Sequence, residues 1–170
     1  MHQRFAPVPA SRPARRRRLG QIAAIAAAAP LIALLASPRP AGAANQAAAR
    51  VSQRLEAWHY ARRQIGKPYR WGGTGPASFD CSGLVYAAYM HAGITLPRTT
   101  QEMLASPLLI RITKRQARRG DLAFFGTGHV ELYAWGNWTF GAAHTGTRIG
   151  FHRMNSFWHP TMYFKVRARE

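Results

Sequence analysis

The sequence predicts an α+β fold in which helices come first and an antiparallel sheet of about five to six strands follows. Apolar residues recur at helical spacing after residue 50, whereas short apolar runs separated by glycine turns follow residue 110. The chain has 170 residues, of which 47% are hydrophobic. It is therefore long enough for one domain with its own core, and too apolar to be disordered throughout.

The first 44 residues predict an export signal rather than part of this fold. Arginines at 15–18 precede an apolar run over 19–36, and Ala41-Gly42-Ala43 supplies a small-residue cleavage site. A retained membrane anchor and a disordered nucleic-acid-binding arm are the alternatives. Because Pro30 interrupts the apolar run and a cleavage site follows it, we expect cleavage after residue 43 or 44. The mature protein is then secreted or held in the cell envelope, without stable membrane insertion.

Residues 45–49 are expected to form a short spacer, and residues 50–170 a single domain. The domain opens with a predicted helix over 50–65, in which apolar positions recur at helical spacing. Gly66-Lys67-Pro68 ends this helix because neither glycine nor proline favours its continuation. A loop dense in glycine and proline follows over 69–76.

A second helix is predicted over 81–92. Asp80 precedes it as a good N-cap, and Gly93 follows it as a residue that readily takes the left-handed conformation at a helix end. A third, short helix is expected to begin at Thr99 or Thr100, whose hydroxyl groups can cap its first turn.

The second half of the domain is predicted to be a ladder of short strands. Glycine turns separate the apolar runs, and the second and third strands are expected to pair as a hairpin around Gly136-Asn137. The predicted strands span residues 122–125, 129–134, 139–143, 149–154 and 163–166.

Cys81 is the only cysteine, so the chain has no intramolecular disulfide and no CxxC metal site. It is either a buried structural thiol or a nucleophile. Its place in the first turn of a predicted helix favours the thiolate, because free backbone N–H groups and the helix dipole stabilise negative charge there. The same N–H groups can hold an oxyanion during acyl transfer.

A nucleophilic cysteine needs a base, and His129 is the best placed of seven histidines. It follows a glycine turn and begins an apolar strand, although a solvated turn histidine is the alternative. A third group would fix the tautomer of its ring. His144 is the candidate, because the expected hairpin brings the start of one strand beside the end of the next.

Several short segments, in this order, resemble the NlpC family of cell-wall cysteine peptidases over about residues 55–155. The most specific are the D-C-S-G element around Cys81 and the H-V-x-x-Y element that begins at His129. The matching segments read YRWGG at 69–73, FDCSGLV at 79–85, LPRTT at 96–100, GDLAFF at 120–125 and GHVELY at 128–133.

The resemblance implies a papain-like fold and hydrolysis of the peptide stems of peptidoglycan, commonly at the γ-D-glutamyl-diaminopimelate bond. It makes Cys81 the nucleophile and His129 the general base, and it places the Tyr69 hydroxyl near the oxyanion site. Asp80 and Ser82 flank the nucleophile and are expected to matter for the helix start and for substrate contact. No metal or organic cofactor is implied.

The chain departs from the family pattern at the third polar residue. The family pattern places that residue, counted back from Gly146, at Gly141 or Ala143, so His144 is displaced by at least one residue. A shift of one residue turns a strand side chain to the opposite face unless a bulge restores it. A backbone carbonyl or a water molecule would then have to take its place.

The net charge of +18 favours anionic partners. Seven of the 24 basic residues lie in 1–44, so the rest of the chain keeps 17 bases against 6 acids. We expect a monomer that binds peptidoglycan stem peptides and the anionic cell-wall surface, and not nucleic acid, because no aromatic–basic motif of a known type is present. Arg98 is a candidate for contacts with substrate carboxylates. The alternatives are an N-acetylmuramoyl-L-alanine amidase of the CHAP type and a catalytically weakened wall-binding module.

Overall fold

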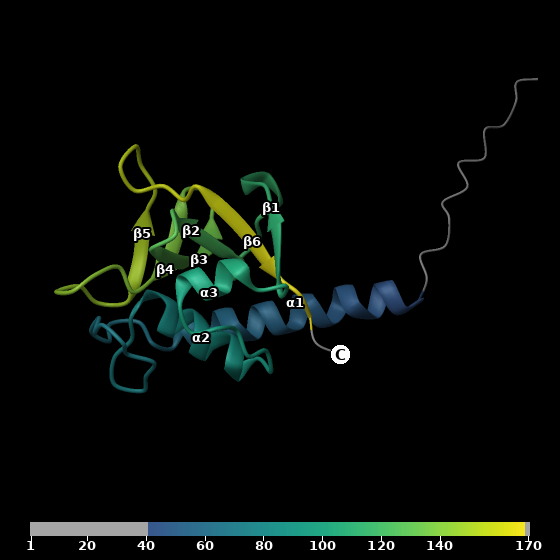
Figure 1. Cartoon of the computed structure of the whole chain (residues 1–170), viewed down its shortest axis with the longest axis horizontal. Coiled ribbons are helices and arrows are strands. Elements are labelled where there is room, and N and C mark those ends of the chain that lie inside the picture. The colour runs from purple at the N-terminus through teal and green to yellow at the C-terminus, as the bar shows by residue number, and fades with distance from the viewer. Residues whose placement is uncertain (1–40, 169–170) are drawn as a thin grey trace, which may run out of the picture. The chain divides into compact units, whose positions relative to one another are not determined.

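The structure, a computed structural model, describes residues 41–168. All but the last four residues of the expected signal peptide lie outside this range. Three helices precede the strands of the sheet (Figure 1): α1 (Ala41–Arg62), α2 (Cys81–His91) and α3 (Thr100–Ala105). The strands are β1 (Leu109–Ile112), β2 (Leu122–Phe125), β3 (His129–Trp135), β4 (Trp138–Gly141), β5 (Gly150–Arg153) and β6 (Met162–Val166), with a 3₁₀ turn, η1 (Lys114–Gln116), after β1.

The six strands form one antiparallel sheet in the order β1-β6-β2-β3-β4-β5. The chain therefore runs β2-β3-β4-β5 as a meander, while β6 returns to pair between β1 and β2. In the centre Leu122 lies opposite Leu132, and Phe124 opposite Val130, and all four side chains are completely buried. Because alternate side chains of a strand point to the same face, these four residues lie on the face of β2 and β3 that the helices cover.

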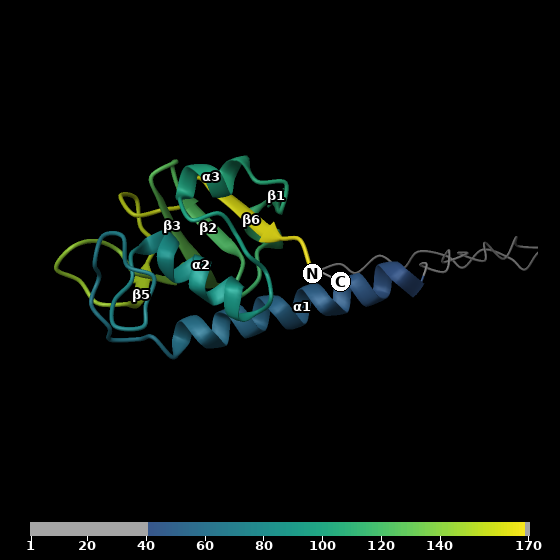
Figure 2. The same ribbon diagram turned by 60° about the horizontal axis from the view of Figure 1, so that its bottom comes forward.

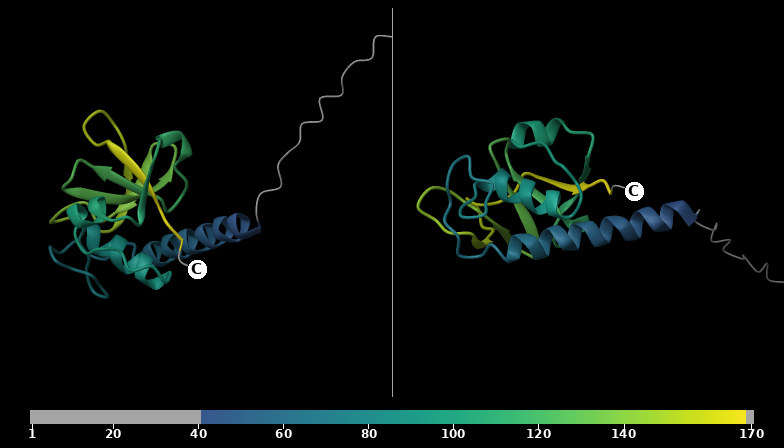
Figure 3. Two further views of the ribbon diagram at one scale, coloured as in Figure 1. Left: turned by 45° about the vertical axis from the view of Figure 1, so that its right-hand side comes forward. Right: turned by 90° about the horizontal axis from the view of Figure 1, so that it is seen from below.

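Helices α1 and α2 pack against each other and α2 packs on β3, so both helices cover the same face of the sheet (Figure 2). Only the second half of α1 is buried there, through Ala57, Trp58 and Ala61. The Trp58 ring meets the Phe140 ring of β4 edge to face, at 5.6 Å between centroids. The first half of α1 extends beyond the sheet, as the view from below in Figure 3 shows.

The structure confirms the predicted α+β fold, the helix that begins at Cys81 and the hairpin of β3 and β4. The residues of the expected spacer, 45–49, are helical, because α1 already begins at Ala41. Alanine is the strongest helix former, and the stretch 41–49 is rich in it. The helix also ends at Arg62, three residues before the predicted end. Strand β1 had no counterpart among the five predicted strands.

Within the part of the chain that the structure describes, no helix is both long enough and apolar enough to cross a bilayer.

Candidate active site

Asp80 organises the loop and helix that carry the cysteine. Its Oδ1 accepts a hydrogen bond from the Gly83 N–H at 2.6 Å and so caps α2, while its Oδ2 accepts from the Gly72 N–H at 2.8 Å. The carboxylate thus connects the glycine-rich loop to the first turn of α2. The side chain is almost fully buried, which strengthens these hydrogen bonds.

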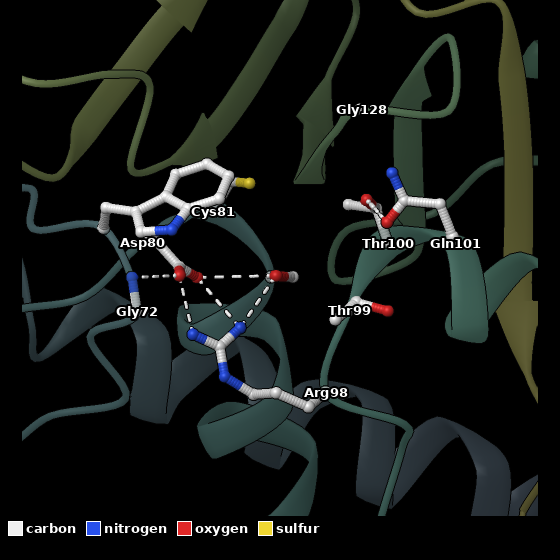
Figure 4. Close-up of a pocket in the computed structure, with 10 residues that line it drawn as sticks. Gly72, Asp80, Cys81, Arg98, Thr99, Thr100, Gln101 and Gly128 are labelled. Atoms are coloured by element: carbon white, nitrogen blue, oxygen red, sulfur yellow. Dashed lines mark hydrogen bonds and ion pairs between the residues drawn. The ribbon is translucent and has the colours of Figure 1, made fainter.

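Arg98 reaches this carboxylate from the segment before α3 (Figure 4). Its Nη2 lies 2.6 Å from Asp80 Oδ2 and its Nη1 lies 3.1 Å from Oδ1, which makes a bidentate ion pair. Nη1 also donates to the Ser82 hydroxyl at 2.9 Å. Most of the guanidinium N–H donors of Arg98 are therefore bound to the two residues that flank Cys81. About a third of its side chain remains exposed beside the pocket.

Gly83 lets α2 approach the glycine-rich loop more closely than any other residue would allow. A Cβ at this position would run into the carbonyl oxygen of Gly73, which is backbone and cannot easily move, and would lie 2.8 Å from Asp80 Oδ1. The close approach also brings the Asp80 N–H to the same Gly73 carbonyl oxygen at 3.0 Å.

We expect Gly83→Ala to lower the free energy of unfolding by about 2–3 kcal/mol, because overpacking against backbone outweighs the gain of about 1 kcal/mol in helix propensity. Urea denaturation followed by tryptophan fluorescence measures it. Gly150→Ala is the matched control, since a Cβ there meets Arg148 at an ordinary 3.8 Å. Equal stability of the two variants would show that the loop can move away from a Cβ at position 83 at little cost in free energy.

Cys81 and His129 lie together at the junction of α2 and β3. The His129 ring and the Val130 N–H both act on the sulfur and stabilise its negative charge. Burial acts to raise the pKa of the Cys81 thiol, but the hydrogen bond and positive charge of His129 outweigh it and leave that pKa below its ordinary value. Burial likewise opposes the charge on His129, yet hydrogen bonds to Cys81 and Glu131 raise the pKa of the imidazole to about 9. Both shifts favour the thiolate–imidazolium form of the pair over the neutral thiol and imidazole.

A pocket of about 340 Å³ opens beside the sulfur. Figure 4 shows the sulfur of Cys81 on the sheet side of the Asp80–Arg98 pair, toward Gly128. An exposed tryptophan of the glycine-rich loop, Trp71, lines the pocket. Its full lining is Trp71, Gly72, Asp80, Cys81, Ser82, Arg98, Thr99, Thr100, Gln101 and Gly128.

Tyr69 lies close enough to this site for its hydroxyl to sense the charges there. Burial raises the pKa of Tyr69, and the negative charges of Cys81 and Asp80 raise it further. The hydroxyl therefore stays protonated and can donate a hydrogen bond to an oxyanion. The structure thus brings together Tyr69, Asp80, Cys81, Ser82 and Arg98 with His129.

His144 is not part of this cluster, and the expectation that it orients His129 is corrected here. It lies beyond the end of β4 in an exposed turn, where its Nδ1 is 2.9 Å from the carbonyl oxygen of Thr145. The displacement by at least one residue is not restored by a bulge, because the strand ends at Gly141. Glu131 instead occupies the far side of the ring, with its Oε1 3.3 Å from His129 Nε2.

Sequence reasoning did not place Glu131, His152 or Trp158 beside His129. Glu131 follows His129 by two residues in the same strand, and this spacing places both side chains on one face, which was the available signal. His152 comes from β5 and reaches Glu131 Oε1 with its Nδ1 at 2.7 Å. Trp158 lies over both imidazoles, at 5.1 and 6.2 Å between ring centroids.

Among residues 41–168, no group of three or more His, Cys, Asp and Glu side chains is arranged to hold a metal ion. The charges at the site are instead paired with one another. A cysteine at the amino end of a buried helix and a histidine on an antiparallel sheet make this a papain-like domain.

The comparison with protein families narrows this class. The family model for NlpC/P60 matches residues 66–167, which include every residue of the site described above. The chain therefore belongs to the NlpC/P60 family.

Two curated relatives share the central part of the chain. A probable endopeptidase p60 of Listeria monocytogenes is 47% identical over 77 residues, which are 43% of this chain and 16% of that protein. The murein DD-endopeptidase MepH of Escherichia coli is 46% identical over 86 residues, 46% of this chain and 31% of that protein. The matched region thus spans less than a third of either relative.

A solved structure covers more of the chain. The peptidoglycan hydrolase RipB of Mycobacterium tuberculosis superposes with a TM-score of 0.61 at 26% identity, over 78% of this chain and 73% of that one.

Proposed function

We propose that the chain is an exported cysteine endopeptidase that hydrolyses the stem peptides of peptidoglycan. Cys81 is the nucleophile, His129 the general base and acid, and Tyr69 a donor to the oxyanion. One arrangement carries the proposal: at the edge of an open pocket, Cys81 begins α2 beside His129 of β3, which stabilises the thiolate and lowers the pKa of the thiol. The printed names of the relatives support the substrate class.

The reaction proceeds in two steps. The Cys81 thiolate attacks the carbonyl carbon of the scissile amide, and the resulting oxyanion accepts hydrogen bonds from the Cys81 N–H at the start of α2 and from the Tyr69 hydroxyl. The His129 imidazolium then gives its proton to the leaving amine, and a thioester remains on Cys81. In the second step His129 takes a proton from water, the hydroxide attacks the thioester, and the thiolate returns. The thiol and imidazole supply nucleophile, base and acid, so the proposal invokes no cofactor.

Asp80, Ser82 and Arg98 serve this mechanism by holding α2 and the loop in place around the sulfur. Asp80 caps the helix whose amino end receives the oxyanion, and Arg98 neutralises the carboxylate. The part of Arg98 that lines the pocket, with Ser82, remains available to a carboxylate of the stem peptide.

A basic surface supports binding to the anionic cell wall. Five exposed basic residues gather in the nine-residue segment around η1. No residue of this segment lines the catalytic pocket, so wall polymers can bind it without filling the site. The residues are Arg111, Lys114, Arg115, Arg118 and Arg119.

Digestion of purified peptidoglycan with the mature protein, followed by mass spectrometry of the fragments, tests the proposal. Cleavage is expected to release two kinds of fragment: one that ends in γ-D-glutamate and one that begins with diaminopimelate. Loss of the D,D cross-link would assign the bond named for the Escherichia coli relative, and free stems that begin with L-alanine would assign the amidase alternative. Binding without any release would leave a wall-binding module and overturn the peptidase.

A further inference from the structure

The Glu131 side chain is a fully buried acid held between two imidazoles. Its Oε1 lies 3.3 Å from His129 Nε2 and 2.7 Å from His152 Nδ1. Burial would raise the pKa of Glu131, but the hydrogen bonds from the two histidines keep it below its ordinary value. The group is therefore a carboxylate, and a carboxylate can only accept, so each of these ring nitrogens carries the hydrogen.

The position across the sheet from Glu131 is a glycine, and the two residues share one space. Continuing the β3–β4 register from the Leu132–Phe140 pair places Glu131 opposite Gly141. A Cβ on Gly141 would lie 2.6 Å from Glu131 Cγ and 2.8 Å from Cδ. A side chain on β4 at this point and the Glu131 side chain on β3 therefore exclude each other.

This exclusion explains why the group expected on β4 is missing. The pattern that predicted a third polar residue placed it at Gly141 or Ala143, and Gly141 has no side chain to offer. The Glu131 carboxylate, which comes from β3 and not from β4, lies beside His129 instead. We infer that Glu131 is the positioning residue of His129, that His152 holds Glu131 in place, and that the Glu131–Gly141 pair replaces a third group from β4. The inference rests on the proposed function.

The carboxylate acts on the histidine in two ways. By accepting the Nε2 hydrogen it leaves Nδ1 as the ring nitrogen available to the Cys81 sulfur, which fixes the tautomer needed for proton transfer. By placing a buried negative charge beside the ring it also stabilises the imidazolium, and so the thiolate that is paired with it.

Trp158 limits competition from water at this cluster. Its ring stacks on Phe125 at 4.4 Å between centroids and lies beside both His129 and His152. The titratable groups that act on His129 are Cys81 from α2 and Glu131 from its own strand. His152 from β5 acts through its hydrogen bond to Glu131. A low-dielectric cover of this kind strengthens the hydrogen bonds beneath it.

Moving the polar side chain from position 131 on β3 to position 141 on β4 tests the inference. Glu131→Gly is expected to lower kcat by about 10²–10³-fold, comparable with loss of a group that orients a catalytic histidine. Gly141→His alone is expected to unfold at lower temperature, because Glu131 fills the space it needs. The double variant Glu131→Gly with Gly141→His is expected to regain at least about tenfold in kcat over Glu131→Gly, since the new imidazole reaches His129 from β4. A double variant no more active than Glu131→Gly would overturn the inference.

A second readout separates positioning from mere structure. In Glu131→Gln the alkylation of Cys81 by iodoacetamide is expected to need a higher pH than in the wild type, because the imidazolium loses its carboxylate. The KM for hydrolysis of the stem peptide is expected to stay unchanged. His144→Ala is the matched control and is expected to keep the wild-type pH profile. A folded Glu131→Gln protein with the wild-type profile and kcat would refute the role of Glu131. A wild-type Cys81 as slow as a free thiol would instead refute the proposed function, so the two failures are distinct.

Discussion

Replacement of Cys81 by alanine is expected to reduce the hydrolysis of peptidoglycan stem peptides by at least about 10³-fold while the protein stays folded. The side chain is small and almost fully buried, and alanine fits the same space without the sulfur. Without a nucleophile at the amino end of α2 no thioester can form, and the oxyanion donors and His129 are left to act on water alone. Release of soluble stem fragments from purified peptidoglycan, quantified by liquid chromatography, measures the loss.

Cys81→Ser is the matched control for the chemistry. Serine keeps a nucleophilic atom in place, but its hydroxyl is far less acidic than the thiol, so we expect only a small residual activity. Thermal unfolding within a few degrees of the wild type would show that both variants are folded. Turnover by Cys81→Ala at the wild-type rate would remove the sulfur from the mechanism, whatever the geometry around it.

Replacement of Asp80 by alanine is expected to have the largest effect on stability, lowering the free energy of unfolding by about 3 kcal/mol. Three losses add up: the N-cap of α2, the hydrogen bond from the Gly72 N–H, and the ion pair that neutralises Arg98. The partial exposure of Arg98 limits the last of these, because water can solvate part of the orphaned guanidinium.

Equilibrium denaturation in urea measures this loss, and Asp80→Asn divides it. Asparagine keeps an oxygen that can cap α2 but loses the charge that pairs with Arg98, so we expect about half of the destabilisation. Glu102→Ala removes an exposed capping-box partner of α3 and serves as the control, with a much smaller loss of stability expected. An Asp80→Ala protein as stable as Glu102→Ala would contradict the view that Asp80 organises the site.

The half of the site that depends on local sequence could be predicted. Asp80 before an apolar helical run signals an N-cap, and the cysteine after it lies at the helix start by necessity. The Thr99 cap of α3 is equally local, and the structure shows it as a full capping box. These features need no knowledge of which strands pair.

The half that depends on strand pairing could not be predicted in the same way. The third group beside His129 is decided by what lies opposite Glu131, and that requires the register of β3 and β4. His152 and Trp158 come from segments more than 20 residues further along the chain, and no local pattern links them to His129. Helix α1 was misjudged for another reason: its alanine-rich start has high propensity but almost no apolar face to recognise.

The charge state of Cys81 beside His129 is most directly tested by the pH dependence of its alkylation by iodoacetamide, in the wild type and in His129→Ala. The account predicts that the midpoint of the wild-type profile lies below the ordinary pKa of a cysteine thiol, and that it moves up toward that value once the imidazole is removed. Identical profiles for the two proteins would show that His129 does not sustain the thiolate, and the acyl-transfer mechanism would lose its foundation.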